Sequence, residues 1–281
     1  MRNHLRLAFI GFGEVGRTFA RGFAAAPDVA LSAYDILFDR PGDGAGRAGT
    51  ARELGVRVAT SAADACRDAD IVISAVTAAS AGAVAAEAAE FLVPGQILFD
   101  INSAAPATKI EAARQVQVSG AAYVEGAVMA PVLAPGLQVP ILAGGAQAAA
   151  LSKTLNSRGM RIEPVATEIG RASAMKLCRS IVIKGLEAIL SDCAAAAGHF
   201  GVSDSVFGSL RASYPSIDWA ALAEAMSERV RTHGIRRAAE MREAGAMLAD
   251  IGMDPCLSLA IADRHERIAA DYAKKCMNSS E

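Results

Sequence analysis

The chain has 281 residues, and we expect it to form two domains of ordinary size. Hydrophobic residues make up 52% of it and charged residues 21%, which allows a sizeable core and excludes an intrinsically disordered protein. The net charge of -2 comes from 28 basic and 30 acidic residues spread along the chain. This distribution provides no basic surface of the kind that binds nucleic acid or an anionic membrane. Small-molecule or protein partners are therefore expected.

The apolar runs and the cysteines indicate in which cellular compartment the protein is expected. No run reaches membrane-spanning length, and residues 1–6 lead straight into a strand without a signal-peptide core. The five cysteines are far apart and form no C-x-x-C pair, so we expect neither a disulfide scaffold nor a metal site. A cytoplasmic protein with reduced thiols is the expectation.

Residues 1–169 alternate short apolar strands with Ala-rich helical stretches, a pattern typical of a doubly wound, mostly parallel α/β sheet of the Rossmann type. The predicted strands are 7–10, 30–34, 57–58, 71–75, 97–100, 122–125 and 139–143. Ser61 and Asp64 predict a capped helix over 61–67, and a further helix is expected to begin near Pro106. The glycine-rich stretch 41–49 is expected to be a surface loop.

Residues 170–281 carry no strand signal and are expected to be all helical, with breaks near 198–203, 214–216 and 252–255. The change of pattern predicts a domain boundary between residues 169 and 170. The stretch 181–193 is apolar around most of its helical circumference, so we expect a buried central helix.

A glycine-rich turn follows the first strand and opens a helix. Gly11 permits a tight turn, Gly13 lets a pyrophosphate approach the backbone, and Gly16 allows the helix to pack on the strand. The predicted cofactor contacts in this turn are Gly11, Phe12, Gly13, Glu14, Val15 and Gly16. Residues 1–169 are therefore predicted to bind a dinucleotide.

Asp35 ends the second strand, where a carboxylate accepts hydrogen bonds from the ribose hydroxyls of NAD. Arg40 and Arg47 follow closely enough to keep NADP possible. Val76 and Thr77 end a later strand and are expected to border the cofactor, because ligands of open parallel sheets bind at the carboxyl ends of strands.

Asn102 and Ser103 follow the next strand at the same edge. We expect Asn102 to contact the cofactor and Ser103 to bind a substrate oxygen, and the alternative for both is turn formation and helix capping. Lys176 begins the central helix, where burial would lower the pKa of its amine toward the range useful in proton transfer. The alternative is a lysine that snorkels or pairs with a carboxylate.

These motifs, in this order, resemble those of the β-hydroxyacid dehydrogenase superfamily, which includes 3-hydroxyisobutyrate and 6-phosphogluconate dehydrogenases. The resemblance rests on the glycine turn, the segment from Asp100 to Lys109 and a Gly-x-x-x-x-x-Lys segment at 170–176. It implies that Lys176 is the catalytic acid/base. Residues from 180 onward resemble the uncharacterised C-terminal domain of 6-phosphogluconate-dehydrogenase-like proteins.

Two departures from the family bear on the substrate. The family's substrate loop reads Asp-Ala-Pro-Val-Ser-Gly-Gly, whereas this chain has Glu125-Gly-Ala-Val-Met129-Ala130-Pro131, which adds bulk and removes an amide donor. Ser180 stands where the family places an asparagine, one helical turn after the lysine. Met129 and Ser180 are therefore predicted to contact a substrate that differs from a simple carboxylate.

One helical face in the second half carries two polar groups among apolar ones: Met226, Val230, His233, Arg237 and Met241. One interpretation is a core histidine with Arg237 paired to Glu240 or Glu243. The other is that His233 and Arg237, together with Arg236, meet an anionic or polyhydroxylated substrate.

The leading hypothesis is an NAD(P)-dependent oxidoreductase that transfers a hydride between nicotinamide and a hydroxyacid or related alcohol or carbonyl. Residues 1–169 would bind NAD, and residues 170–281 would bind substrate and form a homodimer. An imine (C=N) reductase is an alternative enzyme. A non-catalytic dinucleotide-binding regulator, with the loop at 129–131 closing the substrate site, is the alternative from another class.

Overall fold

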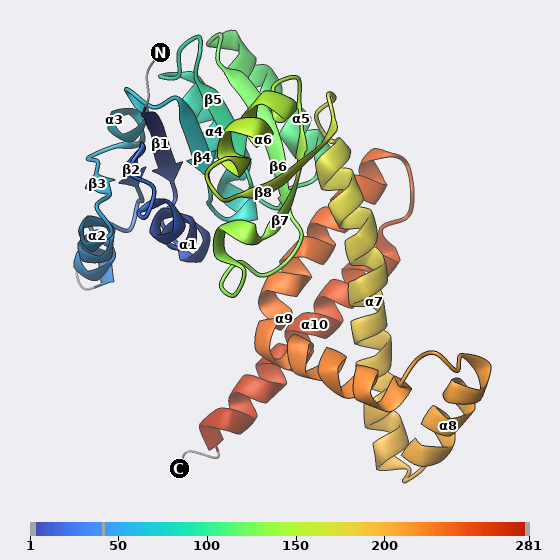
Figure 1. Ribbon diagram of the computed structural model, residues 1–281. Coiled ribbons are helices and arrows are strands. Elements are labelled where there is room, and N and C mark those ends of the chain that lie inside the picture. The colour runs from blue at the N-terminus through green and yellow to red at the C-terminus, as the bar shows by residue number, and fades with distance from the viewer. Residues whose placement is uncertain (1–3, 41–42, 279–281) are drawn as a thin grey trace. The chain divides into compact units, whose positions relative to one another are not determined.

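The computed structural model describes residues 4–40 and 43–278, and its contacts divide the chain into two compact units between Lys176 and Leu177. In these described residues the first unit contains an eight-stranded sheet in the order β3-β2-β1-β4-β5-β6-β7-β8 (Figure 1). The strands are β1 Leu5–Ile10, β2 Val29–Tyr34, β3 Arg57–Val58, β4 Ile71–Ser74, β5 Ile97–Asp100, β6 Ala122–Val128, β7 Pro140–Gly144 and β8 Arg161–Ala166. Neighbouring strands pair in parallel except β6 and β7, which are antiparallel.

Helices cover both faces of this sheet. They are α1 Glu14–Phe23, α2 Asp43–Glu53, α3 Ala62–Cys66, α4 Ala81–Ala89, α5 Pro106–Val118 and α6 Ala148–Asn156, with the 3-10 helices η1 Ala78–Ser80 and η2 Gly136–Gln138. Side chains of β1 alternate between two cores: Phe9 packs with α1, α2 and α6, and Ile10 packs with α3, α4 and α5. The predicted doubly wound α/β fold is confirmed.

One local prediction in this unit is wrong, and one strand was missed. The stretch 41–49, expected to be a loop, enters helix α2 at Asp43, and Ala48 and Ala51 bury their side chains in the core; positions 41 and 42 lie outside the described residues. Strand β8 was not predicted, because Pro164 and the exposed Arg161 and Glu163 leave it little apolar alternation. Its backbone pairing with β7 places it at the edge of the sheet.

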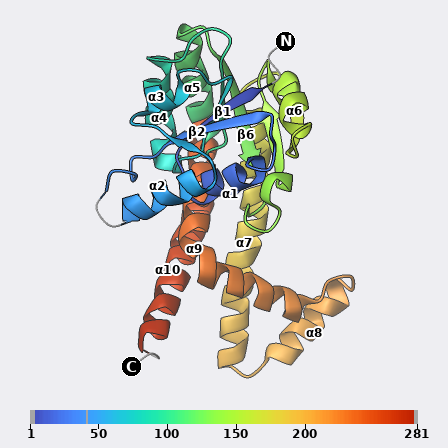
Figure 2. The same cartoon turned by 60° about the vertical axis from the view of Figure 1, so that its left-hand side comes forward.

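The second unit, as far as the structure describes it, consists of helices, and the predicted breaks between them are confirmed. The helices are α7 Arg171–His199, which begins in the first unit, α8 Ser203–Ser213, α9 Trp219–Asp250 and α10 Cys256–Asn278. Helices α9 and α10 pack against each other (Figure 2). They approach closely at Gly234, where a Cβ atom would lie 2.4 Å from the carbonyl oxygen of His265. None of the described helices is both long and apolar enough to span a membrane.

Helix α7 was expected to be buried on all sides, and it is not. Val182 and Ile189 are 60% and 64% exposed, whereas the face that packs inside the second unit carries the polar side chains Ser180, Lys184 and Glu187. Apolar composition alone did not show which residues of this helix are buried. The charged groups Lys184 and Glu187 can be buried because ion pairs satisfy them.

Candidate active site

The glycine-rich turn joins β1 to α1 with the geometry that its sequence predicts. Gly11 has a φ of +92°, and a Cβ atom there would lie 2.4 Å from the carbonyl oxygen of Ala75. A Cβ atom at Gly16 would lie 2.5 Å from the carbonyl oxygen of Gly11, so helix and turn touch. Gly13 instead faces open space, with no atom within 4 Å of a Cβ position, and it caps α1 without a side-chain hydrogen bond. This helix N-terminus can therefore receive an anion.

Asp35 fastens this turn to the end of β2. Its carboxylate accepts hydrogen bonds from the backbone N–H of Phe12 at 2.6 Å and of Leu37 at 2.8 Å, and the residue is 8% exposed. The ring of Phe12 is fully buried and packs near Phe9 and Phe38. Phe12 thus supports the turn from the core. Glu14 and Val15 are the first residues of α1, directly after the turn.

Asn102 ties together the ends of β4 and β5. Its Oδ1 accepts from the N–H of Val76 at 2.6 Å, and its Nδ2 donates to Ser74 and Asp100 at 2.9 and 2.7 Å. These bonds support the turn-forming alternative for Asn102. Thr77 is exposed at the same edge, with its hydroxyl 2.9 Å from that of Ser80.

Ser103 differs from its neighbour. Its Oγ is buried and has no hydrogen-bond partner among the described residues. Met129 lies partly buried just beyond β6, and its N–H donates to the carbonyl of Pro140 at 2.9 Å.

Sequence reasoning missed a buried ion pair at the carboxyl end of β5. Lys109 is 1% exposed, and its Nζ lies 2.8 Å from Oδ1 of Asp100, whose Oδ2 accepts from Tyr123 at 2.6 Å. Burial raises the pKa of Tyr123 far above its usual range, and the charge of Asp100 adds to this shift. Lys109 lies at the i+3, i+4 and i+7 spacing from the apolar Ala112, Ala113 and Val116, and this pattern could have indicated that the lysine points inward.

Lys176 lies in the second turn of α7 and is partly buried. The segment just before this helix sits beside the start of α5, since a Cβ atom at Gly170 would lie 3.3 Å from Cβ of Pro106 and Cδ1 of Ile110. The fold thus brings the beginning of the lysine helix next to the loop that carries Ser103. Glu125, not predicted to act here, accepts hydrogen bonds from the first turn of α7.

Polar residues of the second unit pair differently from expectation. Arg237 forms two hydrogen bonds to the fully buried Glu187, through Nε at 2.6 Å and through Nη2, instead of pairing with Glu240 or Glu243. Glu240 lies 2.7 Å from Lys184, whose Nζ donates to Ser180 at 3.2 Å. Ser180 is 3% exposed.

His233 does not share the buried stripe of α9. It is exposed, and Gly234 takes the inward position one turn after Val230, so the interpretation of His233 as a core histidine is wrong. The core histidine is His265 on α10, which is fully buried, and burial lowers its pKa. Sequence periodicity placed His233 inward because it cannot show which of two adjacent residues, here His233 and Gly234, meets the neighbouring helix.

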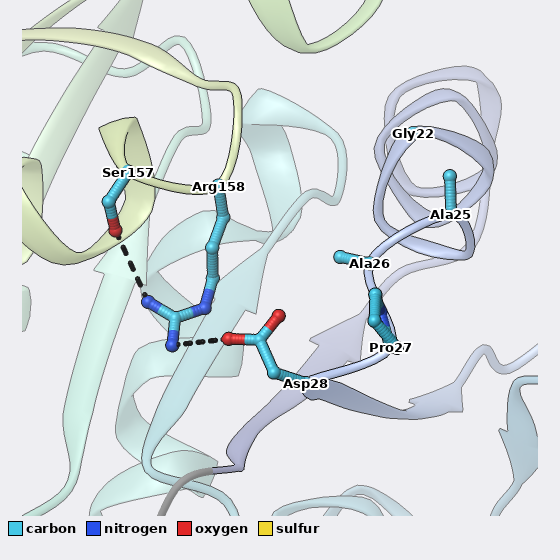
Figure 3. A pocket seen from close by; sticks show the side chains of 7 residues that line it. All are labelled: Gly22, Ala25, Ala26, Pro27, Asp28, Ser157 and Arg158. Carbon is cyan, nitrogen blue, oxygen red and sulfur yellow. Dashed lines mark hydrogen bonds and ion pairs between the residues drawn. The ribbon is translucent and has the colours of Figure 1, made fainter.

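A pocket of about 430 Å³ lies elsewhere in the first unit, where the end of α1 meets the connection from α6 to β8 (Figure 3). Arg158 bonds there to Asp28 at 2.8 Å and to Ser157 at 3.4 Å. None of the predicted site residues lines it. Among the described residues, no three His, Cys, Asp or Glu side chains are grouped to hold a metal ion.

The fold and the turn define a Rossmann-type domain followed by a helical domain. Residues 6–104 match a family described as "NADP oxidoreductase coenzyme F420-dependent", and residues 197–268 match a "Domain of unknown function (DUF1932)". The chain belongs to the β-hydroxyacid dehydrogenase superfamily, in the group that carries this C-terminal domain, and the predicted resemblance is confirmed.

Three similar proteins illustrate this membership. An uncharacterized 28.5 kDa protein of Methanothermus fervidus is 30% identical over 202 residues, covering 72% of this chain and 74% of that protein. The structure of a conserved hypothetical protein from Sinorhizobium meliloti 1021 is 36% identical, with a TM-score of 0.82 and coverage of 95% and 89%. A conserved protein of unknown function with structural similarity to 3-hydroxyacid dehydrogenases is 32% identical, with a TM-score of 0.77 and coverage of 96% and 98%.

Proposed function

We propose that this protein is an NAD(P)-dependent oxidoreductase that transfers a hydride between nicotinamide and a hydroxyacid or a related alcohol or carbonyl. The observation that carries the proposal is the open side of Gly13 at the N-terminus of α1. This turn lies beside the ends of β1 and β4, where the strand order reverses and open α/β sheets bind their ligands. Membership in the superfamily supports it.

The residues of the first unit fit a dinucleotide. The N–H groups at the start of α1 would bind the pyrophosphate, and Asp35, whose two oxygens each accept one backbone bond, would accept a further bond from a ribose hydroxyl. When bound, the nicotinamide supplies the hydride chemistry. Lys176 would remove the hydroxyl proton during oxidation and return it during reduction, and the hydroxyl of Ser103 would hold the substrate oxygen.

A spectrophotometric screen tests this function. Hydroxyacids, polyols and carbonyl compounds are offered with NAD(H) and NADP(H), and the change in reduced-cofactor absorbance is followed. Imines belong in the same screen, because reduction of a C=N bond needs the same cofactor geometry. Substrate-dependent turnover supports the enzyme, whereas tight NADH binding without turnover of any compound class supports the regulator.

Asp35 is expected to make NADH bind at least about tenfold more tightly than NADPH, because its carboxylate repels a 2′-phosphate. Titration of the wild type with both cofactors, followed by cofactor fluorescence, measures this ratio. Arg40→Ala is the control, since Arg40 is exposed and should leave the ratio unchanged. Equal affinities in the wild type, with NADPH binding lost in Arg40→Ala, would assign the chain to NADP.

A homodimer through the second unit is also part of the proposal. Exposed apolar side chains of Val182, Ile189 and Leu257 support it, and Ile189 lines a groove of about 380 Å³ between α7 and α10. Sedimentation should give about twice the chain mass of 28.9 kDa. Ile189→Glu should produce monomers, and Val118→Glu, at an 89% exposed site on α5, should not. A monomeric wild type would remove the dimer.

A further inference from the structure

Glu125 is a fully buried carboxylate at the end of the part of β6 that pairs with β5. Its register partner across the sheet is Asp100, also buried. The two acids are satisfied in different ways: Asp100 pairs with Lys109, whereas Glu125 receives hydrogen bonds from the beginning of helix α7. A buried carboxylate needs such partners, because an unpaired charge in the core is costly.

Four hydrogen bonds connect Glu125 to this helix start. Oε1 accepts from the N–H of Gly170 at 2.7 Å and of Ala172 at 3.0 Å, and Oε2 accepts from the N–H of Ser173 at 3.3 Å and from its hydroxyl at 2.7 Å. The first N–H groups of a helix have no partner inside the helix, and a negative charge there also interacts favourably with the helix dipole. Glu125 therefore acts as the N-terminal cap of α7, supplied from the sheet.

We propose that Glu125 is the positioning residue of Lys176. Lys176 lies one turn beyond Ser173, so whatever fixes the first turn of α7 fixes the origin of the lysine side chain. The strand that carries Glu125 is itself paired on both sides, by β5 and β7, which makes it a rigid anchor. The carboxylate of Glu125 thus holds the first turn of α7, and with it the backbone of Lys176, in a fixed position relative to the sheet. This inference rests on the proposed role of Lys176.

The test compares three variants: Glu125→Gln, which keeps the length and loses the charge, Glu125→Asp, which keeps the charge, and Val124→Ala as the matched control. Val124 is a fully buried neighbour on the opposite face of β6. With a substrate from the screen, Glu125→Gln should lower kcat by about tenfold or more with NADH affinity within about twofold, because displacements near 1 Å can cost about 100-fold. Glu125→Asp should lie between wild type and Glu125→Gln.

A second readout does not depend on turnover. Trace acetylation with acetic anhydride, quantified by mass spectrometry, reports the accessibility of the Lys176 amine, with the exposed Lys153 as internal reference. Fraying of the first turn in Glu125→Gln should raise Lys176 labelling at least about threefold, since the residue is partly buried in the intact helix. Val124→Ala should lower the Tm without this rise.

The two readouts separate the two proposals. A wild type that turns over none of the substrates, together with faster Lys176 labelling in Glu125→Gln, would contradict the proposed function and retain the positioning role. Unchanged labelling in Glu125→Gln, with only a fall in Tm as in Val124→Ala, would overturn the positioning role. Should Glu125→Gln fail to fold, Ser173→Ala removes only the contacts of this hydroxyl, to Glu125 and to the carbonyl of Gly170, and should raise labelling to a smaller degree.

Discussion

Replacing Lys176 by alanine is expected to lower kcat by about 10²- to 10⁴-fold while NADH affinity changes by less than about twofold. The size of the fall is that of a lost general acid/base. The separation arises because the residues proposed to bind the dinucleotide lie on the turn after β1 and at the end of β2, whereas Lys176 lies on α7. Steady-state kinetics on a screened substrate and a fluorescence titration with NADH measure the two quantities.

Lys153→Ala is the matched control, since this lysine is exposed on α6 of the same unit. It should leave both quantities unchanged. A fall in kcat of less than tenfold in Lys176→Ala would mean that Lys176 has a structural role and is not the general acid/base. An equal loss of NADH binding would show that the lysine contacts the cofactor.

The α/β fold could be predicted from the sequence because its central strands, β1, β4, β5 and β6, are buried on both faces. Ile71–Ser74, for example, is a short apolar run that reads as a central strand whatever surrounds it. The edge strand β8 was harder to predict. It carries Pro164 and exposed charges, so its place depends on its parallel pairing with β7 rather than on its own pattern. Tertiary pairing of that kind is not encoded locally.

The glycine turn could be predicted in detail because each glycine meets a local steric demand within a few residues of chain. For Asn102 and Asp35 the sequence could not show the backbone bonds that the structure contains, since a short polar side chain at a strand end bonds to backbone or to ligand with equal chemical ease. Glu125 was placed in the substrate loop, and its partners at 170–173 lie too far along the chain for spacing to reveal them.

The helical unit shows the same limit in its charges. One of the two interpretations of Arg237 paired it with Glu240 or Glu243 of its own helix, yet its partner Glu187 lies on α7. Here a contact between helices is preferred over pairing within one helix, because the buried acid offers two oxygens to the guanidinium. The charges that face His265, from Glu187, Arg237 and Lys184, come from two other helices.

Glu187→Ala is expected to destabilise the protein by about 3–5 kcal/mol, the range found when one partner of a buried ion pair is removed. Glu187 is fully buried, and its loss would leave the guanidinium of Arg237, whose side chain is 13% exposed, without its two hydrogen bonds. The positive charge of Lys184 nearby adds to the cost, although Glu240 partly compensates it. Urea unfolding followed by circular dichroism measures the change in free energy of unfolding.

The matched control is Arg231→Ala, which breaks the surface pairs with Glu224 and Glu228 on α9 and should cost no more than about 1 kcal/mol. The double variant Glu187→Leu with Arg237→Leu should recover most of the lost stability, because removing both charges leaves neither member of the pair buried without its partner. A cost below about 1 kcal/mol for Glu187→Ala, equal to that of Arg231→Ala, would mean that Arg237 escapes to solvent. The buried pair would then contribute nothing to the stability of the second unit.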